Sequence, residues 1–385
     1  MSQRPIYLDA HATTPMDKRV LDAMLPYFTE SFGNPSTNTH IYGWEASAAV
    51  KNAREAIANI INASPEEIVF TSGATEANNL AIKGVAEAYF SQGKHIITVA
   101  TEHRAVLDPC AYLETLGFEV TYLPVQANGI LDLDKLAAAI REDTILVSVM
   151  AANNEIGVLQ PLAEIGKLCH TQEVLFHTDA AQAIAKVPLD VKAMNIDLMS
   201  LTAHKIYGPK GIGALYVRRR DPRVKLAAQI QGGGQERGRR SGTLYTPQIV
   251  GFAKALEIGV ESMKEESERM MGLKRQLWSM FEPLNGIYLN GDFDRSLPNN
   301  LNLSIEGVNG SALLLALQSV VAVSSGSACS SESTAPSHVL TALGRDEKLA
   351  HASLRFGIGR FNTPEEIKTV GKTAIAAIES LRQAN

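Results

Sequence analysis

Cysteine is scarce in this sequence, and its cysteines follow no recognisable pairing or metal-binding pattern. Cys110, Cys169 and Cys329 are the three cysteines among 385 residues. Their spacing gives no support to a disulfide framework or to a thiolate metal site. Free thiols persist in reducing compartments, so the low cysteine content favours a location inside the cell.

Long apolar segments and a strong net charge are also missing. No apolar run approaches the roughly 20 residues that a membrane-spanning helix needs, and residues 1–20 lack the apolar centre of a signal peptide. The 36 basic and 41 acidic residues leave a formal net charge of −5, which gives no global signal for nucleic-acid or membrane binding. The composition therefore predicts a soluble, cytoplasmic protein.

Short apolar segments alternate with helical patterns over the first two thirds of the chain. Apolar residues recur at helical spacing in residues 17–28 and 44–61. Buried strands are predicted at residues 68–70, 96–100, 145–150, 174–176 and 197–201. This alternation is typical of βαβ units. We therefore predict an α/β fold whose mostly parallel central sheet is flanked by helices.

The pattern changes near residue 252, where a long charged helix is predicted at residues 253–281. The segments that follow it are short strands, and the last helix begins after Thr363, with Glu366 closing a capping box. The short strands are expected at residues 287–289, 301–305 and 320–323. We therefore predict a large domain at residues 16–252 and a smaller α+β domain formed by residues 1–15 and 253–385. A hydrophobic content of 45% is sufficient for two domains.

A polar cluster follows each predicted strand of the large domain. These clusters contain Thr75, His103, Asn154, Asp179 with Gln182, and Lys205. Ligands of open α/β sheets bind beyond the carboxyl ends of the strands, so we expect the clusters to share one edge. Taken singly, each has a simpler interpretation, because loop lysines and histidines are usually solvated and a strand-end aspartate often caps the next helix.

The chemistry of the clusters favours an aromatic cofactor that carries a phosphate. In a partly dry pocket, Lys205 can lose its proton and act as the amine that Schiff-base enzymes require. Asp179 suits a protonated ring nitrogen such as that of pyridoxal phosphate, and Gln182, near the same helical face, suits its phenolic oxygen. His103 can stack on the ring and carry protons. Backbone N–H groups at residues 73–75 can bind an anion at a helix N-terminus.

Other binding chemistries fit the sequence less well. No Walker-type lysine pattern is present, which disfavours a nucleoside triphosphate. His177 and His204 lie near the clusters, but acidic or thiol ligands do not recur at ligand spacing, so no metal site is expected. The basic residues within 218–225 are most often a solvated turn, and docking of a partner is the alternative.

Two residues near the end of the chain extend the hypothesis to a reaction. Cys329 lies in SSGSACSSESTAP, and a thiol on such a polar loop is accessible and able to move. Arg355, in SLRFGIGR, carries the planar guanidinium that suits a substrate carboxylate. The simpler interpretations are an idle surface thiol and a surface ion pair.

With these residues identified, the chain closely resembles the cysteine desulfurases of the NifS/IscS type. These enzymes belong to the class V aminotransferase group of fold-type I enzymes that depend on pyridoxal 5'-phosphate (PLP). The resemblance runs from YLDAHATTP to LRFGIGRF and includes SGATEANN, TEHRAV, NNEIG, HTDAAQ, AHKIYGPKGIGALYVR, RSGTL and SSGSACSS. It implies a fold-type I transferase that removes sulfur from L-cysteine to give L-alanine.

The resemblance also implies a role for each matching residue. Lys205 would bind PLP as an internal aldimine, Asp179 would pair with the pyridine nitrogen, Gln182 with the phenolic oxygen, and His103 would stack on the ring. The phosphate would be held by the backbone at Ala74, by Thr75, Thr202 and His204, and by Thr243 of the other subunit. Asn154 and Arg355 would bind the substrate carboxylate, and Cys329 would carry the sulfur as a persulfide.

The partners implied by the resemblance are L-cysteine, a second copy of the chain, and an iron–sulfur scaffold or another sulfur-acceptor protein. Nucleic acid is not expected beyond possible tRNA-modification partners. Alternatives are a selenocysteine lyase, an aminotransferase, or a catalytically idle scaffold. Cys329 argues against an aminotransferase, and the set of Lys205, Asp179 and His103 argues against an idle scaffold. One residue departs from the family pattern, because His11 stands where a small polar residue is more common.

Overall fold

The computed structural model describes residues 4–325 and 335–384. Within them, seven strands form the large sheet, in the order β2-β8-β7-β6-β5-β3-β4. The strands are β2 (Ile68–Thr71), β3 (His95–Val99), β4 (Glu119–Leu123), β5 (Thr144–Ser148), β6 (Leu175–Asp179), β7 (Leu198–Thr202) and β8 (Gly213–Val217). Only β8 is antiparallel to its neighbours, so the predicted mostly parallel α/β sheet is confirmed.

Helices cover both faces of this sheet because successive strand residues point to opposite sides. Val147 belongs to one hydrophobic core and its neighbour Leu146 to the other. The helices of this part are α1 (Lys18–Met24), α2 (Pro26–Thr29), α3 (Ile41–Ile60), α4 (Ala74–Ala88), α5 (Arg104–Thr115), α6 (Leu133–Ala139) and α7 (Leu162–Thr171). Buried residues of α4 and α5 pack on one face, and those of α3, α6 and α7 pack on the other.

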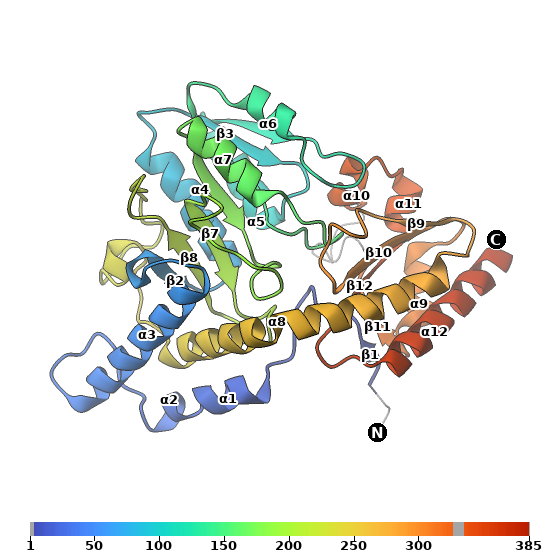
Figure 1. The fold of residues 1–385 in the computed structure, drawn as a ribbon, viewed down its shortest axis with the longest axis horizontal. Helices are drawn as coiled ribbons and strands as arrows, with labels where there is room; N and C mark the ends of the chain where they lie inside the picture. The colour runs from blue at the N-terminus through green and yellow to red at the C-terminus, as the bar shows by residue number, and fades with distance from the viewer. Residues whose placement is uncertain (1–3, 326–334, 385) are drawn as a thin grey trace.

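One long helix, α8 (Thr246–Phe281), connects the large sheet with a smaller part of the molecule (Figure 1). Its first half contributes Phe252 and Leu256 to a core of the large sheet, and its second half contributes Leu277 and Phe281 to a separate core. The two cores therefore meet along α8. The division at residue 252 stays a prediction.

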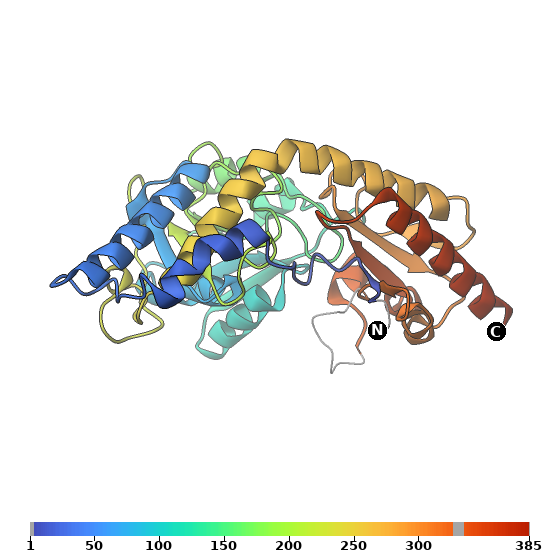
Figure 2. The ribbon, with the colours of Figure 1, turned by 90° about the horizontal axis from the view of Figure 1, so that it is seen from below.

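The smaller part contains an antiparallel sheet in the order β12-β10-β9 and a parallel pair of β1 and β11. Because β1 pairs with β11, the N-terminal segment begins here and then runs toward the large sheet (Figure 2). The strands are β1 (Ile6–Tyr7), β9 (Ile287–Leu289), β10 (Asn300–Ile305), β11 (Val321–Ala322) and β12 (Ser353–Gly357). The helices are α9 (Gly310–Leu317), α10 (His338–Ala342), α11 (Glu347–His351) and α12 (Pro364–Gln383).

Several predicted boundaries were wrong for local reasons. The single helix expected at residues 17–28 is divided into α1 and α2, because Pro26 has no N–H to continue the first helix. The helix expected from residue 253 begins at Thr246. The capping box of Thr363 and Glu366 at the start of α12 is confirmed.

A buried ion pair fastens the segment at residues 235–243 to the large sheet. Glu236 accepts bonds from Arg54 on α3, at 2.6 and 2.8 Å, and from the backbone N–H of Phe70 at 2.8 Å. The side chains of Arg54 and Glu236 are 11% and 1% exposed. Arg240 of the same segment forms a second ion pair, in which its Nε lies 2.7 Å from Glu76 Oε1 on α4. The segment that contains Thr243 is therefore held on the sheet by buried charge.

We expect Glu236→Ala to lower the free energy of unfolding by about 3–5 kcal/mol, because it leaves a buried arginine without its counter-charge. Urea unfolding of the cofactor-bound protein measures the change. Glu119→Ala is the matched control, since Glu119 also binds an arginine through two oxygens but on the exposed surface. Equal losses in the two variants would contradict the prediction.

Candidate active site

The polar clusters at the strand ends meet in one cavity at the carboxyl edge of the large sheet. Its volume is about 520 Å³, which lies within the range of small-molecule sites. β2, β3, β5, β6 and β7 run in the same direction, so their last residues reach the same edge. The predicted site residues that line the cavity are Ala74, Thr75, His103, Asn154, Asp179, Gln182, Thr202, His204, Lys205 and Arg355.

Two predicted site residues are not among those that line the cavity. Thr243 is exposed and belongs to the segment that the Arg54–Glu236 pair holds on the sheet. Cys329 lies outside the described residues. The role predicted for each of the two stays a prediction.

Asp179 ends β6 and has a buried carboxylate that is 5% exposed. Oδ2 accepts a bond from Asn78 Nδ2 at 2.7 Å, and Oδ1 accepts one from the Ala181 backbone N–H at 2.9 Å. Turns rather than a helix follow Asp179. The expected helical face shared with Gln182 is therefore wrong, but the turn still brings Gln182 to the same cavity.

His103 is the N-cap of α5, and its ring faces the cavity. Nδ1 accepts a bond from the Ala105 backbone N–H at 3.0 Å. Burial and the charge of Lys205 lower the pKa of His103 below its ordinary value. The ring is therefore neutral at pH 7, and its hydrogen is on Nε2 because Nδ1 is an acceptor.

The start of α4 forms an anion-binding end of the cavity. Gly73 precedes the helix with a φ of +156°, a conformation that other residues rarely adopt, and Ala74 and Thr75 begin its first turn. N–H groups at a helix N-terminus attract phosphate, and Thr202 lies beside them in the cavity wall. Burial, with the charge of Lys205, lowers the pKa of His204 to about 4, so this residue is neutral at pH 7.

Arg355 enters the cavity from β12 and is 2% exposed. Nη1 donates to the Asn154 carbonyl at 2.9 Å, and Nη2 donates to Asp9 Oδ1 at 2.8 Å. Among the described residues, neither its buried Nε nor Asn154 Oδ1 has a hydrogen-bond partner. Buried donors without partners cost free energy, so a bound carboxylate would complete the Nε site. The alternative of a surface ion pair is wrong, because the guanidinium of Arg355 is buried.

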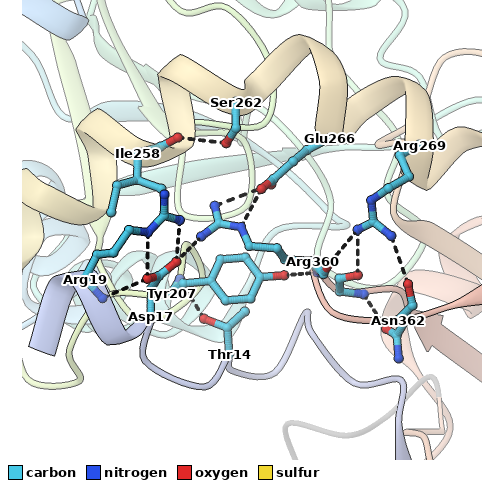
Figure 3. Close-up of polar contacts among 11 residues, drawn as sticks. Thr14, Asp17, Arg19, Tyr207, Ile258, Ser262, Glu266, Arg269, Arg360 and Asn362 are labelled. Carbon is cyan, nitrogen blue, oxygen red and sulfur yellow. Dashed lines mark hydrogen bonds and ion pairs between the residues drawn. The ribbon is translucent and has the colours of Figure 1, made fainter.

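Lys205 lies just past β7. Tyr207, which follows it, is anchored to the smaller part of the molecule (Figure 3). The backbone N–H of Tyr207 donates to Thr14 Oγ1 at 2.8 Å, and its hydroxyl accepts a bond from the backbone N–H of Arg360. The Arg360 guanidinium lies 4.2 Å from the centre of the Tyr207 ring and binds Asp17 and Glu266. The lysine segment is therefore fixed against both α8 and the loop before α12.

Several polar residues that line the cavity or bind its lining had no role predicted from the sequence. Asn78 binds Asp179, Asp9 binds Arg355, and both His11 and Lys186 bind Gln182. Asp9 and His11 belong to the motif YLDAHATTP, which was their only signal in the sequence. Their partners are 171 to 346 residues away, a separation that no local pattern reveals.

The residues present fit PLP. The cavity combines a buried carboxylate for a ring nitrogen at Asp179, a half-buried amine at Lys205 and a helix N-terminus for a phosphate at residues 73–75. The fold and this donor set define a PLP-dependent enzyme of the aminotransferase type. The chain belongs to the family "Aminotransferase class-V", whose profile matches residues 6–370.

Relatives of known name agree with this family. The chain is 57% identical over 383 residues to "Cysteine desulfurase IscS" of Neisseria meningitidis serogroup C, covering 98% of this chain and 93% of that protein. A solved "NifS-like protein" superposes with a TM-score of 0.91 at 38% identity and covers 98% of this chain and 100% of its own. A solved structure of "SspA in complex with cysteine" has a TM-score of 0.80 at 40% identity, with 93% and 100% coverage.

Two further findings concern the described part of the chain. None of its helices is both long enough and apolar enough to cross a bilayer. It also contains no group of three or more His, Cys, Asp or Glu side chains that could hold a metal ion. His177, considered above as a metal ligand, instead lies between the hydroxyls of Ser148 and Ser200, at 2.8 and 3.0 Å.

His177 is expected to make the fold sensitive to acid. Burial lowers its pKa in the folded protein to about 4, whereas an unfolded histidine has a pKa of about 6.5. As the pH falls from about 6.5 to 4, the unfolded chain binds a proton here and the folded chain does not. Stability is therefore lost over this range, by up to about 1.4 kcal/mol per pH unit.

His177→Asn should reduce the slope of unfolding free energy against pH between pH 4 and 6.5, measured by urea unfolding at a series of pH values. The control is His351→Asn, because His351 is exposed on α11 and its ring lies 3.8 Å from the exposed carboxylate of Glu347. An unchanged slope in His177→Asn would contradict the assignment.

Proposed function

We propose that this protein is a PLP-dependent cysteine desulfurase that converts L-cysteine to L-alanine and keeps the sulfur as a persulfide on Cys329. The observation that carries the proposal is the cavity in which Lys205, Asp179 and Arg355 converge. The relatives named cysteine desulfurase and the cysteine-bound structure of a relative support L-cysteine as the substrate.

Bound PLP would supply an electron sink for the substrate carbons. Lys205 would hold the cofactor through its amine and could carry protons beside it. Asp179 would keep a proton on the ring nitrogen, Gln182 would donate to the phenolic oxygen, and His103 would pack against the ring. The α4 terminus at Ala74 and the side chains of Thr75, Thr202 and His204 would bind the phosphate.

The substrate carboxylate binds at the opposite end of the cavity. Arg355 Nε, which is buried and has no described partner, donates to it, and Asn154 closes the same wall. Asp9 and the Asn154 carbonyl hold the other two guanidinium nitrogens, so the arginine is oriented before the substrate arrives. Such preorganisation reduces the cost of binding.

Cys329 takes the sulfur and passes it to an acceptor. Its thiolate attacks the substrate sulfur, the carbon–sulfur bond breaks, and a sulfur–sulfur bond forms on the enzyme. An iron–sulfur scaffold or another sulfur-acceptor protein then receives the sulfur. The cytoplasmic location and the identity of the acceptor stay predictions.

Cys329→Ser should bind PLP and L-cysteine normally but lose almost all alanine and sulfide production, because it has no thiolate to receive sulfur. Absorption spectroscopy checks the cofactor, and assays of alanine and sulfide with a reductant check turnover. After brief exposure to L-cysteine, mass spectrometry should find one extra sulfur on the wild-type peptide that contains Cys329.

Cys110→Ser and Cys169→Ser are the matched controls and should remain active. Both thiols are buried, and burial raises the pKa of each to about 12, so neither is a thiolate at neutral pH. Sulfide release by Cys329→Ser at the wild-type rate would overturn the proposal in favour of an aminotransferase-type enzyme.

The enzyme acts as a homodimer in which Thr243 completes the phosphate site of the other subunit. The exposure of Thr243 and its absence from the lining of its own cavity support this proposal. Thr243→Ala should weaken PLP binding about tenfold or more, the usual effect of losing a hydrogen bond to a charged group. Thr369→Ala, an exposed helical threonine, is the control.

Mixed dimers show whether Thr243 acts in the cofactor site of its own subunit or in that of the other subunit. When differently tagged Lys205→Ala and Thr243→Ala chains are co-expressed, a mixed dimer contains one fully wild-type site only if Thr243 acts across the interface. That site should bind PLP with wild-type affinity at limiting cofactor. A mixed dimer without a tight site, or a monomer with full cofactor occupancy, would refute the shared site.

A further inference from the structure

His11 departs from the family pattern, and its ring forms part of the cavity wall beside Gln182. The side chain is 1% exposed and lies in the segment between β1 and α1. Nδ1 lies 3.1 Å from Gln182 Oε1, and Nε2 lies 3.2 Å from the backbone oxygen of Asn299. Both ring nitrogens therefore face oxygen atoms.

The contacts of Gln182 determine which end of its amide is oxygen. Nε2 donates to the backbone oxygen of His11 at 2.9 Å, and a carbonyl can only accept. Oε1 accepts from Lys186 Nζ at 3.1 Å. A reversed amide would place its oxygen against the His11 carbonyl and its NH₂ group against the amine, so the orientation is fixed.

This orientation allows the His11 ring to donate to the Gln182 oxygen. Burial, followed by the charges of Lys186 and Arg355, lowers the pKa of His11 well below its ordinary value, so the neutral ring carries one hydrogen. Nδ1 faces Gln182 Oε1 and Nε2 faces the Asn299 carbonyl, and each oxygen has another donor, Lys186 Nζ and the Ile358 backbone N–H respectively. A hydrogen on Nδ1 donates to Oε1 and adds a third contact that holds the amide.

One N–H of the Gln182 amide remains for the cavity. The other N–H of the amide donates to the His11 carbonyl, and Oε1 lies against His11 Nδ1 and Lys186 Nζ. Gln182 is 2% exposed and lines the cavity, and within the described part of the chain this remaining N–H has no hydrogen-bond partner, so it is available to a bound ligand.

We propose that His11 is a positioning residue: with its hydrogen on Nδ1, it helps to hold the Gln182 amide so that an N–H faces the phenolic oxygen of PLP, and this lowers the pH at which the cofactor loses its proton. This inference rests on the proposed function, because it assigns Gln182 to the phenolic oxygen. A hydrogen bond to the anionic oxygen favours the deprotonated cofactor.

The test is a pH titration of the visible absorption band of the PLP-bound enzyme without substrate. His11→Ser, which restores the small polar residue common in the family, should raise the midpoint by about 0.5–1 pH unit, the equivalent of one hydrogen bond. His11→Gln, whose amide can donate to Oε1 in place of Nδ1, should restore most of the wild-type midpoint. His351→Ser, an exposed histidine on α11, is the control.

A double-variant cycle shows whether His11 acts through Gln182. Gln182→Ala alone should raise the midpoint at least as much as His11→Ser, and adding His11→Ser to it should cause no further shift. Additive shifts, or no shift in His11→Ser, would overturn the inference. Failure of the proposed function itself would give a different result. The wild-type protein would then have no PLP absorption band, or the band would survive in Lys205→Ala.

Discussion

The common direction of the strands in the large sheet is the constraint on which the site depends. Except for β8, the described strands of this sheet are parallel, so each delivers its last residue to the same edge. Asp179 ends β6, and Thr202 ends β7. Side chains that are more than 100 residues apart in the sequence, such as Asn78 and Asp179, therefore reach the same cavity.

The second half of the site comes from the junction between the two parts of the molecule. Arg355 reaches the cavity from β12, and Asp9 from the N-terminal segment holds it there. The Tyr207–Arg360 contact binds the residues after Lys205 to the same junction. The lysine and the arginine are thus positioned by one interface, so a shift of the smaller part would move the Arg355 end and the Lys205 end of the cavity together.

Buried polar groups give this arrangement its rigidity. Glu236, His177 and Gln182 each have partners on separate segments, and each is shielded from solvent. A buried polar group is costly unless its partners are in place, so these networks disfavour alternative packings. The Gln182 network goes further, because its partners fix which atom of the amide is nitrogen and which is oxygen.

Apolar periodicity and short motifs are local properties, so the sheet class, the strand-end clusters and the family could be predicted from the amino-acid sequence. It did not reveal the division of α1 from α2 or the turn after Asp179, where local geometry overrides the expected helix. The burial of Arg355 against Asp9, the place of His177 between two serines and the contact of His11 with Gln182 became visible only in the folded molecule. The physical reason is that burial and hydrogen bonding at these positions join residues far apart in the chain, and no local pattern contains that information.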